Sequence, residues 1–272
     1  MFLPENIDLA QSEKYNLSIR LMPNGFSFCI YSFLDKSVFH YHKVNFSKNL
    51  SYEENLKKIF FEVNFFTQPF RKTTVISVSP HYTLIPDAYF NKKKAKDIFE
   101  FNIHKNTGEI LCDYMEEHDI HIIHDMDNNV HSFLSRTLWN PSFESFVKSL
   151  MVFFNKHQAE TTSKRLFVDF HDNFISVFSY LKHNLLSANT FKNTHSVDAV
   201  YYIASVAEKI SMDQNNDWLF LSGNLTENKE SIDILKSLIK NTADIEIDSQ
   251  LNVPEGLKNE IPGDILISLC EL

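Results

Sequence analysis

One pattern of secondary-structure signals occurs twice in this chain, and it restricts the folds that the chain can adopt. Three apolar-rich strands separated by tight turns are followed by an amphipathic helix, first over Tyr15–Phe66 and again over Lys164–Met212. Sequential antiparallel strands followed by helix-linked strands give a mixed sheet with helices packed on it. The duplication therefore predicts an α/β protein of two related lobes, with a crevice between them as the place for a ligand.

The first copy of the pattern carries clear local signals. Asn16–Met22 and Phe26–Leu34 are apolar runs on either side of Asn24-Gly25, a hairpin signal because both residues tolerate positive φ. Ser37–Phe46 is the third expected strand. Ser51-Tyr52-Glu53-Glu54 is a capping box, which predicts that a helix begins there.

Similar local signals predict the strands and helices in the rest of the chain. Thr73–Ser79 is a β-branched run typical of a strand buried in a parallel sheet. We place the boundary of the lobes near residue 160, which gives lobes over 1–160 and 161–272, and we expect the last helix to pack back on the first lobe. Further expected helices are Pro86 to about Phe101, Asn129–Trp139 with Asn128 as its cap, Glu144–Gln158, one capped by Ser196, Lys229–Lys240 and one from Pro262 and Asp264 to near Leu272. Further expected strands are Glu109–Met115, Asp119–Asp125, Pro141–Phe143, Arg165–Phe170, Phe174–Leu181, Leu185–Phe191, Asp217–Ser222 and Ala243–Ile247.

Composition excludes several classes of protein. The formal net charge of -9 disfavours general binding of a phosphate backbone, which needs a basic surface, so we expect no nucleic acid as partner. The 3 Cys are widely spaced and form no CxxC motif, which argues against a disulfide framework. We find no signal peptide at Met1–Ala10 and no run of about 18 apolar residues. We therefore expect a cytoplasmic protein that does not insert into a membrane.

These strands and turns resemble a known family. Three strands, a helix and a strand, repeated in two ribonuclease H-like lobes, are similar to the actin-like ATPase fold of actin, sugar kinases and heat-shock ATPases. Within that superfamily the chain most resembles an uncharacterised bacterial group, domain of unknown function 3822. The resemblance covers nearly the whole chain and rests on Asn16–Phe46 with Asn24-Gly25, on Arg165–Phe191 with Val168-Asp169, and on Leu219–Asn224.

The resemblance implies where a nucleotide would bind. Active members hold ATP-Mg with two hairpin turns, each with an Asp before a Gly, and with a third loop that usually has paired glycines. Candidate crevice residues in this chain are Asn24, Gly25, Asp169, His171, Asn173, Gly223 and Asn224.

Several of these positions depart from the implied pattern. Arg20 stands about where the metal-organising Asp belongs, and a guanidinium cannot bind a cation. His171 stands where a Gly is expected, and its imidazole should obstruct the approach of the backbone to a phosphate. Asn224 replaces the second glycine of the third loop. We therefore expect degenerate nucleotide loops and no cofactor, with ATP-Mg as the alternative.

Two sets of histidines are candidates for a metal site. His121 and His124 point to opposite faces of a strand, so they would not share a metal directly. His40 and His42 share a face but have no third ligand. We assign no metal site.

Two functions remain open. The first is a non-catalytic binding or scaffold protein whose crevice or aromatic surface meets a protein partner. The second is an ATP-binding ATPase or nucleotide-gated switch, in which Asp169 would organise Mg²⁺, Asn24 and Gly25 would contact phosphate, and Gly223 would face the adenosine. A third reading, a metal hydrolase that uses the histidine strand, has the least support. No catalytic residue is assigned, and the sequence favours a protein that is not an enzyme.

Overall fold

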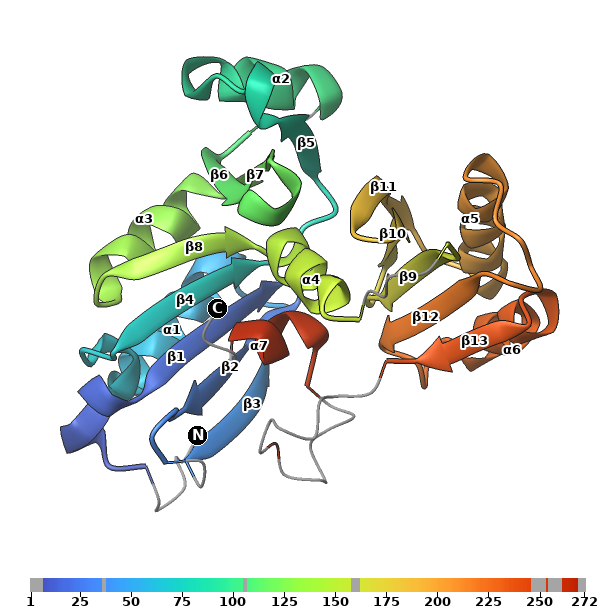
Figure 1. The fold of residues 1–272 in the computed structure, drawn as a ribbon. Helices are drawn as coiled ribbons and strands as arrows, with labels where there is room; N and C mark the ends of the chain where they lie inside the picture. The colour runs from blue at the N-terminus through green and yellow to red at the C-terminus, as the bar shows by residue number, and fades with distance from the viewer. Residues whose placement is uncertain are drawn as a thin grey trace. The chain divides into compact units, whose positions relative to one another are not determined.

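The computed structural model describes residues 7–35, 38–104, 107–157, 162–245, 253 and 261–268. The chain folds into two compact units (Figure 1): unit 1 holds Met1–Ser149 with Ser249–Leu272, and unit 2 holds Leu150–Asp248. Each unit has a five-stranded mixed sheet with the same strand order, β3-β2-β1-β4-β8 in unit 1 and β11-β10-β9-β12-β13 in unit 2. The predicted α/β fold of two related lobes is confirmed.

The large sheet of unit 1 begins with the predicted meander. Its strands are β1 (Asn16–Met22), β2 (Gly25–Tyr31), β3 (Phe39–Asn45), β4 (Lys72–Ser77) and β8 (Pro141–Ser145). β1, β2 and β3 pair antiparallel, whereas β4 pairs parallel with both β1 and β8. The β-branched run expected in a parallel sheet therefore lies between two parallel neighbours.

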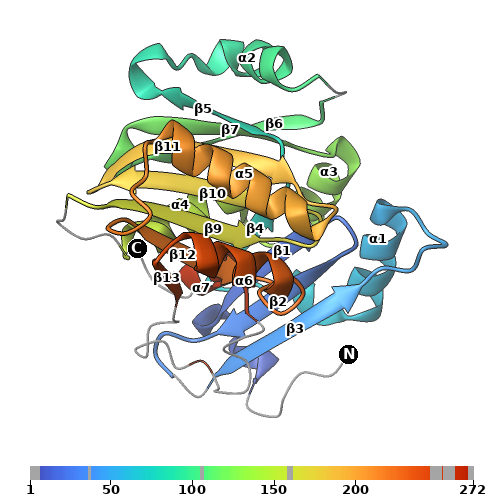
Figure 2. The same cartoon turned by 90° about the vertical axis from the view of Figure 1, so that its right-hand side faces the viewer.

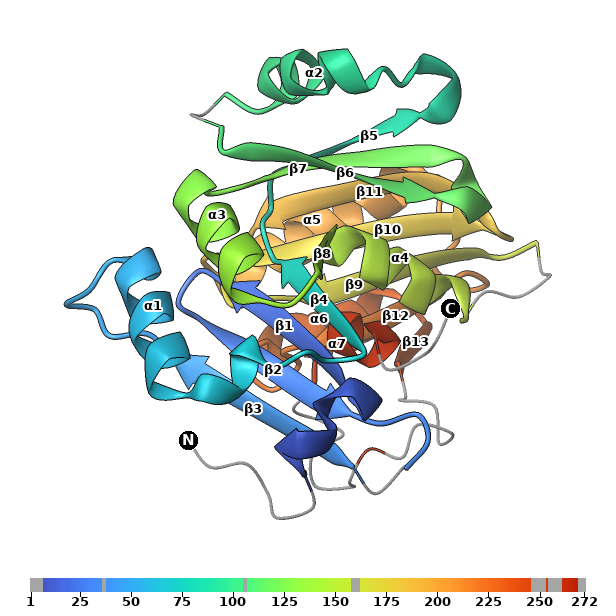
Figure 3. The same cartoon turned by 90° about the vertical axis from the view of Figure 1, so that its left-hand side faces the viewer.

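Alternate residues of β1 face opposite sides of this sheet. Leu17 and Ile19 are fully buried in a cluster that includes Leu56 and Phe60 of α1 (Tyr52–Glu62). α3 (Asn128–Thr137) contributes to the same cluster, and Figure 3 shows α1 and α3 at this sheet. Since successive side chains of a strand alternate, Arg20 faces the other side, where α7 (Gly263–Ser268) packs on β1.

The caps of these helices are set by side chains. The predicted capping box is confirmed: Glu54 N donates to Ser51 Oγ at 3.2 Å and Ser51 N donates to Glu54 Oε2 at 2.8 Å. The cap predicted for α3 was wrong by one residue. Asp127 takes that place because its carboxylate accepts from the N–H groups of Asn129 and Val130 at 2.9 and 3.0 Å.

Unit 1 also carries a three-stranded antiparallel sheet, in the order β5-β7-β6 (Figure 3). β6 (Glu109–Met115) has the predicted bounds, and β7 (Ile120–Met126) is displaced by one residue from its prediction. The helix predicted from Pro86 to about Phe101 is not continuous: Asp87–Tyr89 and Lys92–Lys94 are short 3-10 helices, and the α-helix α2 covers only Ala95–Asn102. The preceding Tyr82–Pro86 is the edge strand β5, which was not predicted. An edge strand tolerates a terminal proline, whose missing N–H takes no ladder bond.

Unit 2 repeats the architecture around its own core. Its strands are β9 (Lys164–Phe170), β10 (Phe174–Leu181), β11 (Asn184–Lys192), β12 (Trp218–Gly223) and β13 (Asn241–Asp244). Helices α5 (Ser196–Lys209) and α6 (Lys229–Leu238) lie on the same face of the sheet (Figure 2). The side chains of Leu166, Val168 and Leu221 are fully buried in a hydrophobic cluster to which both helices contribute.

Several predicted boundaries differ from the structure. The cap of α5 is His195 and not Ser196, and the carboxylate of Asp198 accepts from His195 N at 3.0 Å. α4 covers Phe146–Asn155, a shorter span than predicted. The predicted ends of the last strand at Ile247 and of the last helix near Leu272 lie outside the described residues. In the described part of the chain, no helix combines the length and apolarity needed to cross a membrane.

Candidate functional site

Arg20 in β1 forms an ion pair inside unit 1. Its Nε lies 2.9 and 2.7 Å from the two carboxylate oxygens of Asp264 in α7, and the two side chains are only 7% and 1% exposed. Burying a charge is costly unless an opposite charge compensates it. The guanidinium therefore has a structural partner at the position where the resemblance expects a metal-organising carboxylate.

The first hairpin turn is tight and is built differently from the prediction. Met22 pairs with Gly25, so the turn consists of Pro23 and Asn24, which are both exposed. A Cβ on Gly25 would lie 2.1 Å from the carbonyl oxygen of Val44 in β3. Gly25 is thus required for the close approach of β2 and β3, which explains it without a bound phosphate.

The second hairpin gathers buried polar side chains at the end of β9. Asp169 Oδ2 lies 3.1 Å from His171 Nε2, and Ser222 Oγ donates to Asp169 Oδ1 at 2.6 Å. The imidazole of His171 stacks on the ring of Phe174, with the centroids 4.0 Å apart. Ser176 Oγ, fully buried, lies 3.4 Å from the same nitrogen of His171.

The order of these groups differs from that of a hydrolytic triad. In a triad the imidazole stands between a nucleophilic oxygen and a carboxylate and contacts them with its two nitrogens. Here one nitrogen, Nε2, faces both Asp169 and Ser176, and the carboxylate of Asp169 stands between Ser222 and His171. The arrangement orders the turn and offers no accessible nucleophile among these residues.

The third loop closes on the same strand end. Gly223 has φ 85°, and a Cβ there would lie 2.3 Å from the carbonyl oxygen of Phe170. Asn224 N donates to that oxygen at 2.8 Å, while its Nδ2 donates to Glu227 Oε2 at 2.6 Å. Asn173 is exposed, and its carbonyl accepts from Asn193 N at 2.9 Å.

The candidate residues are divided between the units. Asn24 and Gly25 belong to unit 1, and the other candidates belong to unit 2. Within unit 2 the structure brings Asp169 and His171 into direct contact, and Gly223 and Asn224 close on Phe170, the residue between those two. The assignment of these residues to a nucleotide stays a prediction.

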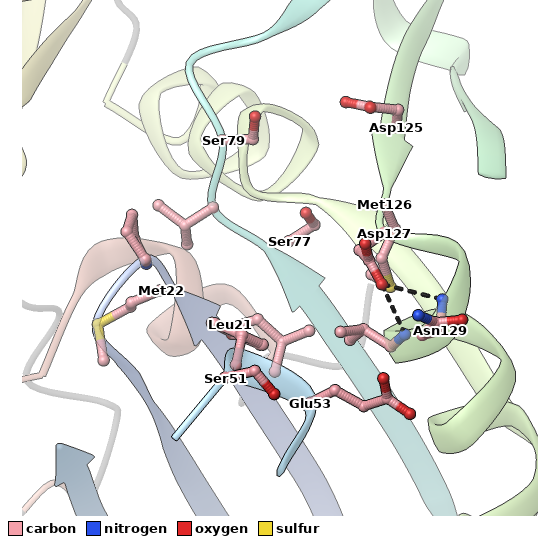
Figure 4. A pocket seen from close by; sticks show the side chains of 14 residues that line it. Leu21, Met22, Ser51, Glu53, Ser77, Ser79, Asp125, Met126, Asp127 and Asn129 are labelled. Atoms are coloured by element: carbon pink, nitrogen blue, oxygen red, sulfur yellow. Dashed lines mark hydrogen bonds between the residues drawn. The ribbon is translucent and has the colours of Figure 1, made fainter. Parts of the chain in front are cut away.

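A pocket of about 420 Å³ lies within unit 1 (Figure 4). It lies at the carboxyl ends of β1, β4 and β7 and at the first residues of α1 and α3. Apolar side chains share the wall with hydroxyl, amide and carboxylate groups. The apolar and aromatic members are Leu21, Met22, Pro23, Tyr52, Val78, Met126 and Val130, and the polar members are Ser51, Glu53, Ser77, Ser79, Asp125, Asp127 and Asn129.

Sequence reasoning missed this pocket. The sequence places Ser79 and Asp125 at the ends of two expected strands, Thr73–Ser79 and Asp119–Asp125, and no local pattern connects them. The available signal was the parallel pairing of Asn16–Met22 with Thr73–Ser79, because ligands bind outside the carboxyl ends of parallel strands.

The candidate metal-binding histidines lie beside single carboxylates or beside each other. His121 Nε2 lies 2.7 Å from Asp87 Oδ1, and His124 Nε2 lies 3.3 Å from the buried Asp113 Oδ2. The rings of His40 and His42 stack at 6.1 Å, which confirms that they share a face. Among the described residues, no group of three or more His, Cys, Asp or Glu side chains is arranged to hold a metal ion.

Comparison with known proteins identifies the family. The model of the family described as Protein of unknown function (DUF3822) matches residues 4–242. The chain belongs to this family. No curated protein matches the sequence.

Solved structures agree with the fold. A Bacteroides thetaiotaomicron protein with an actin-like ATPase fold and unknown function is 25% identical, with a TM-score of 0.84 over 97% of this chain and 99% of that one. The PilM-PilN type IV pilus biogenesis complex contains a chain that is 9% identical, with a TM-score of 0.60 over 93% of this chain and 96% of that one. This member of the DUF3822 family thus has the actin-like ATPase fold.

Proposed function

We propose that this DUF3822 protein is a non-catalytic binding or scaffold protein that keeps the actin-like fold with degenerate nucleotide loops. The observation that carries the proposal is the buried ion pair of Arg20 with Asp264. A positive charge engaged by a helix stands at the position where the resemblance expects a carboxylate that would hold hydrated Mg²⁺.

The second hairpin supports the same conclusion. A phosphate-binding turn needs bare backbone N–H groups, which requires small residues. His171 fills the turn with a ring that stacks on Phe174 and lies beside Asp169, and its own N–H donates to Phe174 O at 3.0 Å. That backbone donor is therefore already used within the hairpin.

The partner we propose is a protein, bound in the cytoplasm of a bacterium. A chain with this fold occurs in the PilM-PilN type IV pilus biogenesis complex, at 9% identity to ours, which offers an analogy of fold. A binding protein needs no hydrolysis, so the loss of the phosphate loops would leave such a role intact.

The test is a thermal melt with and without millimolar ATP-Mg. A ligand present at 100 times its Kd adds about 2.7 kcal/mol of stability, which raises the Tm of a domain by several degrees. We expect no shift. A shift that disappears in Asp169→Asn would refute the proposal, and it would support the nucleotide-gated alternative.

That alternative has one observation in its favour. Asp169 stands at the end of β9, where the resemblance expects the metal-organising carboxylate of the second hairpin, and Ser222 orients its side chain. In this alternative Asp169 would hold Mg²⁺ through water, Asn24 and Gly25 would contact phosphate, and Gly223 would face the adenosine. The same melt distinguishes the two functions.

A further inference from the structure

We infer that the unit 1 pocket binds a basic side chain, Arg or Lys, flanked by apolar residues of a partner protein. The inference rests on the proposed function, because it names the chemistry of the partner. It assigns the recognition to a pocket inside unit 1 and to residues outside the candidate nucleotide loops.

Two helix N-termini lie in the pocket wall, those of α1 and α3. Free N–H groups at a helix N-terminus attract anions. In α3 the carboxylate of Asp127 accepts from Asn129 N and Val130 N, and in α1 the side chains of Ser51 and Glu54 accept from each other's N–H groups. The caps thus occupy several of these donors and place carboxylates beside them, which disfavours a phosphate or another anion as the occupant.

The charged side chains in the described wall of the pocket are acidic. Three carboxylates line the pocket, those of Glu53, Asp125 and Asp127, and no Lys, Arg or His is found among the described residues of its wall. Lys57, outside the wall, pairs with Glu53 at 2.5 Å and offsets its charge, and Gly108 N donates to Asp125 Oδ2 at 3.2 Å. The wall keeps a net negative charge from Asp125 and Asp127. Opposite charges attract more strongly where water is partly excluded, so a cation is the complementary occupant.

Part of the pocket wall is apolar. Leu21, Met126 and Val130 are nearly fully buried beside the carboxylates, and Met22 and Val78 line the same space. Arg and Lys side chains carry their charge on an apolar stem that packs on such surfaces. The volume of about 420 Å³ falls within the range of roughly 300–1,000 Å³ that is usual for ligand sites.

The experiment selects peptides from a displayed random library on the full purified chain. The enriched peptides are synthesised and titrated, together with copies in which the basic residue is replaced by citrulline or norleucine. We expect enrichment of Arg or Lys beside apolar residues. We expect the uncharged copies to bind about 10-fold more weakly or worse.

Two variants of α1 provide a matched comparison. Glu53 and Glu62 each pair with a Lys four residues away, at 2.5 and 4.0 Å, but only Glu53 lines the pocket. Glu53→Gln should weaken the peptide about 3- to 10-fold, whereas Glu62→Gln should leave its affinity unchanged. The charge reversals Glu53→Lys and Glu62→Lys should widen the difference.

Several results would overturn the inference: enriched peptides without a basic residue, equal effects of the two Gln variants, or competition by inorganic phosphate. Nα-acetyl-arginine amide binding as tightly as the peptides would exclude a partner segment as the specific occupant. A Tm shift with ATP-Mg, combined with peptide binding that depends on Glu53, would refute the proposed loss of nucleotide binding but uphold this inference.

Discussion

Replacing Asp264 by Asn tests the central ion pair of unit 1. The side chain keeps its shape and loses its charge, which leaves the guanidinium of Arg20 buried without its counter-charge in α7. Breaking a buried pair by removing one partner costs about 3–5 kcal/mol. For a domain of about 150–250 residues, each kcal/mol lowers the Tm by about 2–4 °C, so we expect a decrease of roughly 6–20 °C.

The assay is calorimetric unfolding of the full chain, with Glu62→Gln as the control. Glu62 lies 4.0 Å from Lys58 on the surface of the same unit, with both side chains more than half exposed, so the loss of that pair should cost at most about 1 kcal/mol. The double variant Arg20→Met with Asp264→Leu should recover most of the lost stability, because an apolar pair of similar volume often replaces a buried ion pair without cost. A Tm of Asp264→Asn no lower than that of the control would refute the reasoning.

Three further predictions concern other parts of the fold. Burial and, secondarily, the like charge of His42 lower the pKa of His40, so the unfolded chain binds a proton at His40 more tightly than the folded chain. The contribution of His40 to stability is therefore complete above pH 6.5 and is lost as the pH falls below that value. Urea unfolding from pH 5 to 8 should show a weaker pH dependence in His40→Phe. Gly223→Ala should destabilise unit 2 by more than about 1 kcal/mol in urea unfolding, because φ is 85° and the new methyl meets Phe170 O; an unchanged midpoint would contradict the described loop. Asp127→Ala should cost about 0.5–2 kcal/mol through the lost cap of α3, whereas Asp127→Asn should retain most of it, as the same measurement would show.

Much of the fold could be predicted because its strands carry strong local signals. β1 and β10 have the predicted bounds, because each is an uninterrupted apolar-rich segment that ends at a turn. β5 was missed because a five-residue edge strand that ends in Pro86 also reads as the start of a helix. Tyr82, Thr83 and Ile85 favour a strand, but the run is short, and its pairing with β7, which no local pattern records, decides the structure.

The candidate site was harder to predict than the fold. The adjacency of Asp169 and His171 follows from the hairpin, but the hydroxyl of Ser222 reaches Asp169 from a strand 53 residues later. Asp264 gave no sign of its role, because its partner Arg20 is 244 residues away. The pocket joins three strand ends with two helix starts, and such a meeting of distant segments depends on packing.

The contact between β1 and α7 has a consequence for the order in which the chain folds during synthesis. Unit 1 contains both Met1–Ser149 and Ser249–Leu272, so unit 2 is an insertion within it. Asp264 is therefore synthesised late, and Arg20 can form its ion pair with Asp264 only after that. All segments of unit 2 are synthesised before the second segment of unit 1. A released chain that ends at Asp248 should therefore hold a protease-resistant unit 2 and a unit 1 that is more easily cleaved than in the full chain.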